Sequence, residues 1–368
     1  RPRCGDRWRG DGGHRGARHC DERDGDAAHS RYVDRRTVAE NMLRHRVVIF
    51  CHISNPIARA LLKGTLGALQ GRADAEVVAI CPFGEHSFAS QLGEWVRTGA
   101  LRTVQRLLDP ELPVHRMDPG PIPIGVIARK IRAEIIPVAR DEGAFDDLTR
   151  RLARLRPTAA INLYTPRRFP PPLLALFRSA INYHNGALPR FRGLRATHWS
   201  VYLRERTSGW AVHHMTREVD AGNVLASGAV PITDGCSIAG LERAKVEQAL
   251  AEMHVWLERW FGGDPGAPQS GESRLFTRAD YAAVTRIASP GQLSAADWRW
   301  RVRCFSRVWA FVDGEWIPVT RLVPVQELRR GEIGWRCADG TCLRVIRANF
   351  LPMIFHRKTL GSAGMRFR

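Results

Sequence analysis

No stretch of this chain approaches the run of about 18 consecutive apolar residues that a membrane-spanning helix needs. The first residues also lack the order of charged and then apolar residues that marks a secretory signal peptide. We therefore expect a cytoplasmic protein with no membrane partner. Hydrophobic residues make up 44% of the 368 residues, which is enough to fill the core of one large domain and a smaller one.

Lysine is scarce, although the chain is strongly basic. Of its 56 basic residues only four are lysines, and the net charge is +19. A clustered positive charge attracts phosphate groups, but here the arginines recur along the whole chain. The excess of arginine over lysine is as consistent with coding bias as with a function. We therefore do not favour a nucleic-acid partner, and the oligomeric state, a homodimer included, stays open.

Paired cysteines of the C-x-x-C type are also absent. The eight cysteines show no regular spacing, and a zinc site at Cys337 and Cys342 would need two further ligands near them. The sequence therefore predicts reduced, mostly buried thiols and no metal site.

Composition divides the chain into four parts. Residues 1–41 are rich in Arg, Gly and Asp and have almost no apolar periodicity, which predicts a disordered extension. Residues 42–262 hold the chemistry-bearing motifs and are predicted to form the catalytic domain. Residues 263–274 begin with a Gly- and Pro-rich run and are predicted to be a linker. Residues 275–368 are predicted to form a small β-rich domain.

The fold class predicted is α/β, with a Rossmann-like, mostly parallel sheet and flanking helices. Its first unit is strand, helix and strand over residues 46–51, 57–69 and 76–81, and this order builds parallel sheets. The remaining pattern predicts strands at 158–163, 180–184, 209–215, 223–232, 316–319, 343–348 and 352–356, and helices at 141–156, 173–177, 196–204, 237–260 and 294–310.

The most informative stretch is residues 181–193, where an amide and an imidazole stand two residues apart before a turn through Pro189 and Gly193. In a strand, residues i and i+2 point to the same face, so Asn182 and His184 can converge on one small volume. An uncharged N–H donor beside a titratable ring suits acyl transfer, in which an oxyanion develops.

A carboxylate follows about thirty residues later, in the stretch from Gly209 to Gly222. Asp220 lies at the end of this strand-and-turn element. Each residue also has a simpler interpretation: Asn182 as a turn residue, His184 as a strand histidine whose ring nitrogens are hydrogen-bonded within the protein, and Asp220 as the cap of a turn. Together and in order, the three favour catalysis.

The stretch from about residue 141 to 263 resembles the formyltransferases that use 10-formyltetrahydrofolate, a family that includes glycinamide ribonucleotide, methionyl-tRNA and sugar N-formyltransferases. Two motifs carry the resemblance: Asn182 and His184 followed by Leu188-Pro189 and Phe191-Arg192-Gly193, and then Gly209 and His213 followed by Asp220 and Gly222. Two ordered motifs at the family's separation are a specific signal.

The resemblance places the family's catalytic trio on Asn182, His184 and Asp220. Asn182 and a protonated His184 would donate to the oxyanion, and Asp220 would favour the charged ring and accept the proton that leaves the attacking nitrogen. His213 matches the family's second histidine and is expected to face and support the trio, while His214 points to the other face of the strand.

The resemblance also implies where the folate and the acceptor bind. The pterin would lie between the loop that holds Leu163, Tyr164 and Pro170 and the backbone at Val219 and Ala221. An anionic substrate group would meet the residues Ser54, Asn55, Arg190 and Arg192. The co-substrate expected is 10-formyltetrahydrofolate, with no metal.

The predicted function is formyl transfer to the primary amine of a small metabolite. Residues 194–199 resemble formyltransferases that act on amino sugars or specialised amino acids, so an amino-sugar nucleotide or related amine is the first choice. Three alternatives stay open: methionyl-tRNA formyltransferase, formyltetrahydrofolate hydrolase, and a binding protein that keeps the fold without turnover. tRNA is not the favoured partner.

Overall fold

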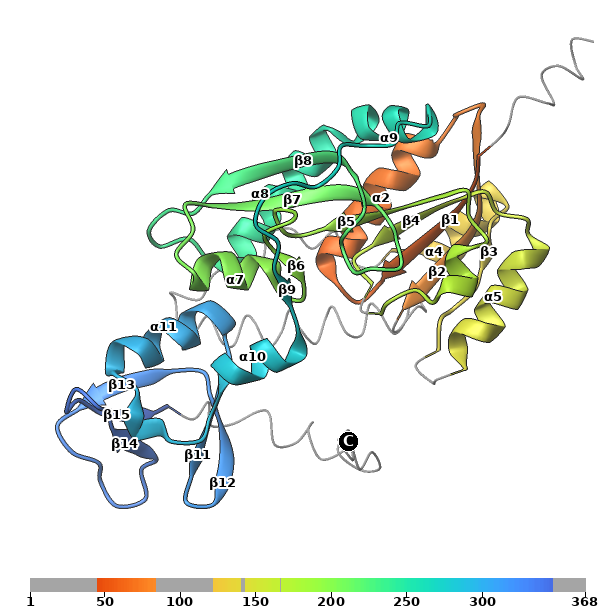
Figure 1. The fold of residues 1–368 in the computed structure, drawn as a ribbon. Coiled ribbons are helices and arrows are strands. Elements are labelled where there is room, and N and C mark those ends of the chain that lie inside the picture. The colour runs from red at the N-terminus through yellow and green to blue at the C-terminus, as the bar shows by residue number, and fades with distance from the viewer. Residues whose placement is uncertain (1–44, 84–121, 140–142, 166, 347–368) are drawn as a thin grey trace, which may run out of the picture. The chain divides into compact units, whose positions relative to one another are not determined.

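The computed structural model describes residues 45–83, 122–139, 143–165 and 167–346 (Figure 1). All of them belong to one compact unit. The predicted extension over residues 1–41 and the strand predicted at 352–356 lie outside the described residues.

A seven-stranded sheet forms the centre of the N-terminal part of the described residues, in the order β3-β2-β1-β4-β5-β7-β8. The first five strands in this order pair in parallel, whereas β7 pairs antiparallel with both β5 and β8. The prediction of a mostly parallel α/β sheet is therefore confirmed. The bounds are β1 (His45–His52), β2 (Ala75–Phe83), β3 (Glu134–Ile135), β4 (Ala159–Leu163), β5 (Ser179–His184), β7 (Thr207–His214) and β8 (Val224–Pro231).

Helices cover both faces of this sheet, because its central strands are apolar on both sides. In β1, Val47, Ile49 and Cys51 pack into a core shared with one set of helices, while Val48 and Phe50 pack into a second core on the other face. The first set is α2 (Pro56–Leu69), α4 (Ile124–Ile131), α8 (Ile238–Ala251) and α9 (Met253–Phe261), and the second is α5 (Ala144–Arg154) and α6 (Pro171–Leu174).

The helix predicted over residues 237–260 is wrong in one respect, because two helices occupy this stretch. They meet at Glu252, whose φ of −92° and ψ of 3° leave the helical range. The buried positions continue across the break at helical spacing, from Val246 and Ala249 to Met253 and Trp256. Periodicity alone therefore cannot reveal the break.

The C-terminal part contains two three-stranded sheets, β10-β11-β12 and β13-β15-β14. The helix predicted to reach residue 310 ends at Phe305, where Ser306 adopts a left-handed conformation and the chain turns into β11. The elements of the C-terminal part are β9 (Leu275–Phe276), α10 (Arg278–Thr285), β10 (Arg286–Ile287), η1 (Pro290–Gln292), α11 (Ala295–Phe305), β11 (Val308–Val312), β12 (Glu315–Val319), β13 (Leu322–Val325), β14 (Gly334–Arg336) and β15 (Cys342–Val345).

Within the described residues, no helix has the length and apolarity to cross a membrane. The same residues contain no group of three His, Cys, Asp or Glu side chains placed to hold a metal ion.

Trp298 anchors the core of the C-terminal part. Its side chain is fully buried, its indole N–H donates to the Pro290 carbonyl at 2.9 Å, and its ring packs on that of Trp335 at 4.6 Å. Trp298→Ala should lower the free energy of unfolding by about 3–5 kcal/mol, because it removes buried area and leaves a cavity. Trp316→Ala, at a ring that is 37% exposed, is the control and should cost about 1 kcal/mol or less. Denaturant titration measures both, and equal losses would contradict the assigned core.

Candidate active site

Asn182 and His184 lie on the same face of β5, at its carboxyl end. The alternating residues Ile181 and Tyr183 point through the opposite face into the core beneath α2, α8 and α9. This alternation leaves the amide and the imidazole on one side, as their spacing predicts. The neighbouring strand β7 places His213 directly beside Asn182 in the antiparallel register.

Asp220 reaches these residues from the turn that follows β7. The turn is tight: Asp220 has a φ of 50°, in the left-handed region that residues other than glycine rarely adopt. Gly222 makes the turn close on the strand, since a Cβ there would lie 1.9 Å from the His214 carbonyl oxygen. The Asp-x-Gly pattern therefore has a steric cause in this fold.

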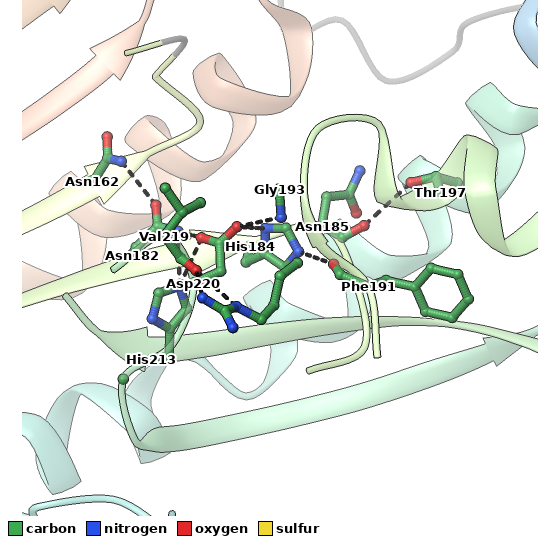
Figure 2. A network of polar contacts seen from close by, with 12 residues as sticks. Asn162, Asn182, His184, Asn185, Phe191, Gly193, Thr197, His213, Val219 and Asp220 are labelled. Carbon is green, nitrogen blue, oxygen red and sulfur yellow. Dashed lines mark hydrogen bonds and ion pairs between the residues drawn. The ribbon is translucent and has the colours of Figure 1, made fainter. Parts of the chain in front are cut away.

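The Asp220 carboxylate is the centre of the polar network in Figure 2. Its Oδ2 accepts a hydrogen bond from the Gly193 backbone N–H at 2.8 Å and lies 3.4 Å from His184 Nδ1. Its Oδ1 lies 3.3 Å from His213 Nε2 and accepts from Asn182 Nδ2 at 3.4 Å. Burial by itself raises the pKa of this carboxyl, but His184, His213 and the Gly193 N–H outweigh burial and hold the pKa below its usual range. Asp220 is therefore ionised.

The tautomer of His184 follows from its second nitrogen. Nε2 lies 2.6 Å from the Phe191 carbonyl oxygen, which can only accept, so Nε2 carries a hydrogen and donates it. Burial lowers the pKa of His184, even though Asp220 and the Phe191 carbonyl act to raise it. The ring is therefore neutral at neutral pH, with an unprotonated Nδ1 that faces Asp220. The lowered pKa favours the neutral ring over the protonated His184 predicted from the sequence, because burial outweighs the neighbouring carboxylate.

His213 and His214 point in opposite directions. His213 is 2% exposed; its Nδ1 donates to the His214 carbonyl at 2.8 Å, and its Nε2 lies 3.0 Å from Asn182 Nδ2. His214 instead contacts the Asp264 carbonyl at 2.9 Å and lies 3.4 Å from Ser179 Oγ. The structure thus brings His213, and not His214, to Asn182, His184 and Asp220.

Asn162 is a residue of the network that sequence reasoning missed. It lies on β4 opposite Asn182, and its Nδ2 donates to Asn182 Oδ1 at 2.9 Å (Figure 2). This bond turns the Asn182 oxygen toward β4 and its NH₂ group toward Asp220. The available signal was a single amide in the otherwise apolar buried strand 159–163.

Lys245 is a second missed residue. Its side chain is fully buried, and its Nζ donates to the Asn185 carbonyl at 3.0 Å, Thr197 Oγ1 at 2.7 Å and Ser208 Oγ at 3.1 Å. Burial lowers the pKa of Lys245 to about 7, against the opposing effect of Glu242. Lys245 therefore fixes the backbone of Asn185, the residue that follows His184. Helical periodicity predicts that position 245 is buried, but it does not reveal the hydrogen-bond partners of Lys245, which lie in other segments of the chain.

The predicted folate contacts lie at the same edge of the sheet, in different environments. The Leu163 side chain is fully buried in the core, so only its backbone can face a ligand. Tyr164 has a φ of 63°, and burial raises the pKa of its phenol. Pro170 precedes the first turn of α6. Val219 and Ala221 flank Asp220, and the Val219 carbonyl accepts from Arg192.

The four residues predicted to contact the substrate have protein partners or lie on the loop after β1. Asn55 Oδ1 accepts from the Ile57 and Ala58 backbone N–H groups and so caps α2, while Ser54 is half-buried beside it. Because β1, β4 and β5 are adjacent and parallel, this loop lies at the same edge as His184.

The two arginines are engaged within the protein. Arg192 donates through Nε and Nη2 to the Val219 carbonyl at 2.9 and 2.7 Å. Arg190 pairs with Glu205 at 2.7 Å and Glu272 at 3.3 Å. Arg192 therefore contacts the turn that holds Asp220, and Arg190 is directed to surface carboxylates. Their contact with a substrate stays a prediction.

The chain resembles known formyltransferases. Residues 120–254 match the family model described as formyl transferase. GDP-perosamine N-formyltransferase of Brucella melitensis is 24% identical over 127 residues, which are 34% of this chain and 49% of that protein. Methionyl-tRNA formyltransferase of Enterococcus faecalis is 36% identical over 76 residues, which are 21% of this chain and 23% of that protein. The chain thus spans about half, or less, of the length of these curated relatives.

A solved structure of a sugar N-formyltransferase from a Shewanella species superposes with a TM-score of 0.50 at 13% identity. The match covers 76% of this chain and 97% of that one, and at this identity it shows the fold alone. The segment that matches the family model contains β5, β7 and the turn with Asp220. Residues 120–254 therefore resemble a formyl transferase domain, and it is through this segment that the chain is similar to the formyltransferases.

Proposed function

We propose that this protein transfers a formyl group from 10-formyltetrahydrofolate to the primary amine of a small metabolite, with an amino-sugar nucleotide as the first candidate. The observation that carries the proposal is the ionised, buried Asp220 carboxylate, 3.4 Å from the unprotonated nitrogen of His184 and 3.4 Å from the Asn182 amide. A donor and a proton acceptor meet there at the carboxyl end of β5.

The reaction uses these groups as follows. The amine attacks the formyl carbon, a C–N bond forms, and the carbonyl oxygen becomes an oxyanion that the Asn182 NH₂ group stabilises without carrying charge. The amine nitrogen then gives up a proton to the pair of His184 Nδ1 and Asp220, either directly or through water. When the bond from the carbon to the folate nitrogen breaks, this proton moves to the leaving nitrogen.

A neutral His184 suits this sequence better than a charged one. An imidazolium cannot accept a proton, whereas Nδ1 of the neutral ring can, and the resulting cation would face an ionised Asp220 at 3.4 Å. The pair therefore stabilises the proton only once the reaction releases it. Asn162 holds the Asn182 amide with its NH₂ group toward Asp220 and His213, and one of its two N–H groups would turn to the oxyanion when the substrates bind.

The acceptor is proposed from the relatives. One bears the name GDP-perosamine N-formyltransferase, and the solved neighbour is a sugar N-formyltransferase. Both support an amino sugar. The methionyl-tRNA formyltransferase match is stronger in identity but covers only 76 residues, so tRNA is the second acceptor to be tested.

The test combines purified protein and 10-formyltetrahydrofolate with a panel of amines that includes amino-sugar nucleotides, amino acids and methionyl-tRNA. We expect tetrahydrofolate release only with an amine, and formylated amino-sugar nucleotide as the product. Release with water alone would support a hydrolase, efficient formylation of methionyl-tRNA would overturn the preferred acceptor, and no release would point to a binding protein.

Substitution of the trio tests the assigned roles. His184→Ala and Asp220→Asn should each lower kcat by about 10²- to 10⁴-fold, because each removes half of the proton-accepting pair. His214→Gln is the matched control: it removes a half-buried neighbouring histidine from the other face of β7 and should leave kcat near the wild-type value. Steady-state kinetics, with circular dichroism to check folding, measures these effects. Wild-type rates in either trio variant would contradict the mechanism.

The pH dependence tests the protonation state of His184. A lowered pKa keeps the ring neutral, and so able to accept a proton, to lower pH. kcat/KM should therefore hold its value as the pH falls past the ordinary histidine pKa of 6.5 and decline only below it. Besides Asp220, the charged or titratable groups that act on His184 are His213 and Lys245, and both lower its pKa.

Asp220→Asn removes the carboxylate that raises the pKa of His184. The acid limb of the remaining activity should therefore move to still lower pH. A decline centred above pH 6.5 in the wild-type protein would show that His184 is charged in the resting state, contrary to the assignment.

A further inference from the structure

The segment that follows α9 and leads through β9 to the C-terminal part, residues 264–276, is more than a linker. In Figure 1 it is the teal chain that runs from α9 to β9. It is joined to β8 where Ala267 and Val224 exchange two backbone hydrogen bonds, of 2.8 and 2.9 Å. It is joined again where β9 pairs with β6 (Arg192–Gly193), within the Phe-Arg-Gly triplet of the family motif. This connecting segment is therefore fixed at both ends beside the turns of the active site.

Gln269 lies between these two junctions and contacts the turn that holds Asp220. Its Nε2 donates to the Asp220 carbonyl at 2.9 Å and to the Gly222 carbonyl at 2.8 Å. A carboxamide NH₂ has two hydrogens, so this one group satisfies both carbonyls. The first carbonyl belongs to Asp220, the residue with the left-handed backbone at a φ of 50°, and the second lies two residues later in the same turn. Gln269 therefore stabilises a conformation that a non-glycine residue disfavours.

The other junction acts on the Asp220 side chain. Gly193 N–H donates to Asp220 Oδ2 at 2.8 Å, and Gly193 itself lies against the connecting segment, where a Cβ would be 2.4 Å from the Phe276 carbonyl oxygen. Arg192, the other residue of β6, donates to the Val219 carbonyl and, at 3.3 Å, to Ser273 Oγ of the connecting segment. Backbone and side chain of the Asp220 turn are thus held by the same segment.

We infer that Gln269 is a positioning residue, which fixes the Asp220 turn so that its carboxylate meets His184 and the Gly193 N–H. The inference deepens the proposed function and rests on it wherever turnover is the readout. It also assigns the connecting segment to the active site, because the catalytic domain without residues 264–276 would hold all three trio residues but lack the groups that orient one of them.

Two substitutions separate positioning from simple packing. Gln269→Ala removes both hydrogen bonds, and Gln269→Glu keeps the size but places an acceptor against two carbonyl oxygens. If Gln269 only fills space, Glu should be the milder change. If its NH₂ group orients the turn, both should lower kcat, by about 10²-fold for a misplacement near 1 Å, and Glu should lower it at least as much as Ala. Ser270→Ala, at the exposed neighbouring residue, is the control and should keep the wild-type kcat.

A second measurement does not depend on turnover. Amide hydrogen exchange, followed by NMR, reports the Gly193 N–H that donates to Asp220, while the Leu194 N–H that donates to the Phe276 carbonyl at 2.9 Å reports the pairing of β6 with β9. In Gln269→Ala we expect the Gly193 amide to exchange about tenfold faster or more, with Leu194 unchanged.

The outcomes distinguish this inference from the proposed function. Unchanged exchange at both amides would overturn the inference, because Gln269 would then not position the Asp220 carboxylate. Faster exchange at both would overturn it too, because Gln269 would then stabilise the pairing of β6 with β9 as a whole. Wild-type kcat in Gln269→Glu would overturn it as well. If the wild-type protein transfers no formyl group, the proposed function fails, but the exchange of Gly193 still decides whether Gln269 positions Asp220.

Discussion

The buried carboxylate of Asp220 is the constraint on which the site depends. An ionised group out of water is costly unless donors surround it. Here the donors are the backbone N–H of Gly193 and the amide of Asn182, and two histidines on neighbouring strands lie within 3.4 Å of the carboxylate. The three side chains are themselves hydrogen-bonded, His184 to the Phe191 carbonyl, His213 to the His214 carbonyl and Asn182 to Asn162. The site is therefore a network in which one charge sets the orientation of the other groups.

The sheet supplies the geometry that this network needs. Parallel strands bring the carboxyl ends of β1, β4 and β5 to one edge, and the antiparallel β7 returns the chain beside β5. Apolar residues on both faces of β1 hold the sheet between two helical layers. The same burial has a chemical consequence: it lowers the pKa of His184 and keeps the ring neutral beside a carboxylate. Packing and proton chemistry thus have a common cause.

Groups far apart in the sequence stabilise the loops of this edge. Lys245 of α8 holds the Asn185 carbonyl, and Gln269 of the connecting segment holds the carbonyls of Asp220 and Gly222. Neither belongs to the motifs that identify the family. Both donate to backbone carbonyls, and such contacts leave no pattern in the sequence, because any donor of suitable length and placement can make them. The two bonds from Gln269 stabilise the turn in which Asp220 has a positive φ.

The sequence by itself determined the fold class, the same-face pairing of Asn182 and His184, and the presence of Asp220 in order behind them, because alternation along a strand and the spacing of motifs are local properties. Only the tertiary structure decided that His184 is neutral, that Asn162 orients Asn182 and that residues 264–276 contact the Asp220 turn. The helix break at Glu252 likewise escaped prediction, because the apolar spacing continues through it. Burial and contacts between distant segments exist only once the chain has folded, and in this protein they set the charge and the orientation of the residues that the sequence identified.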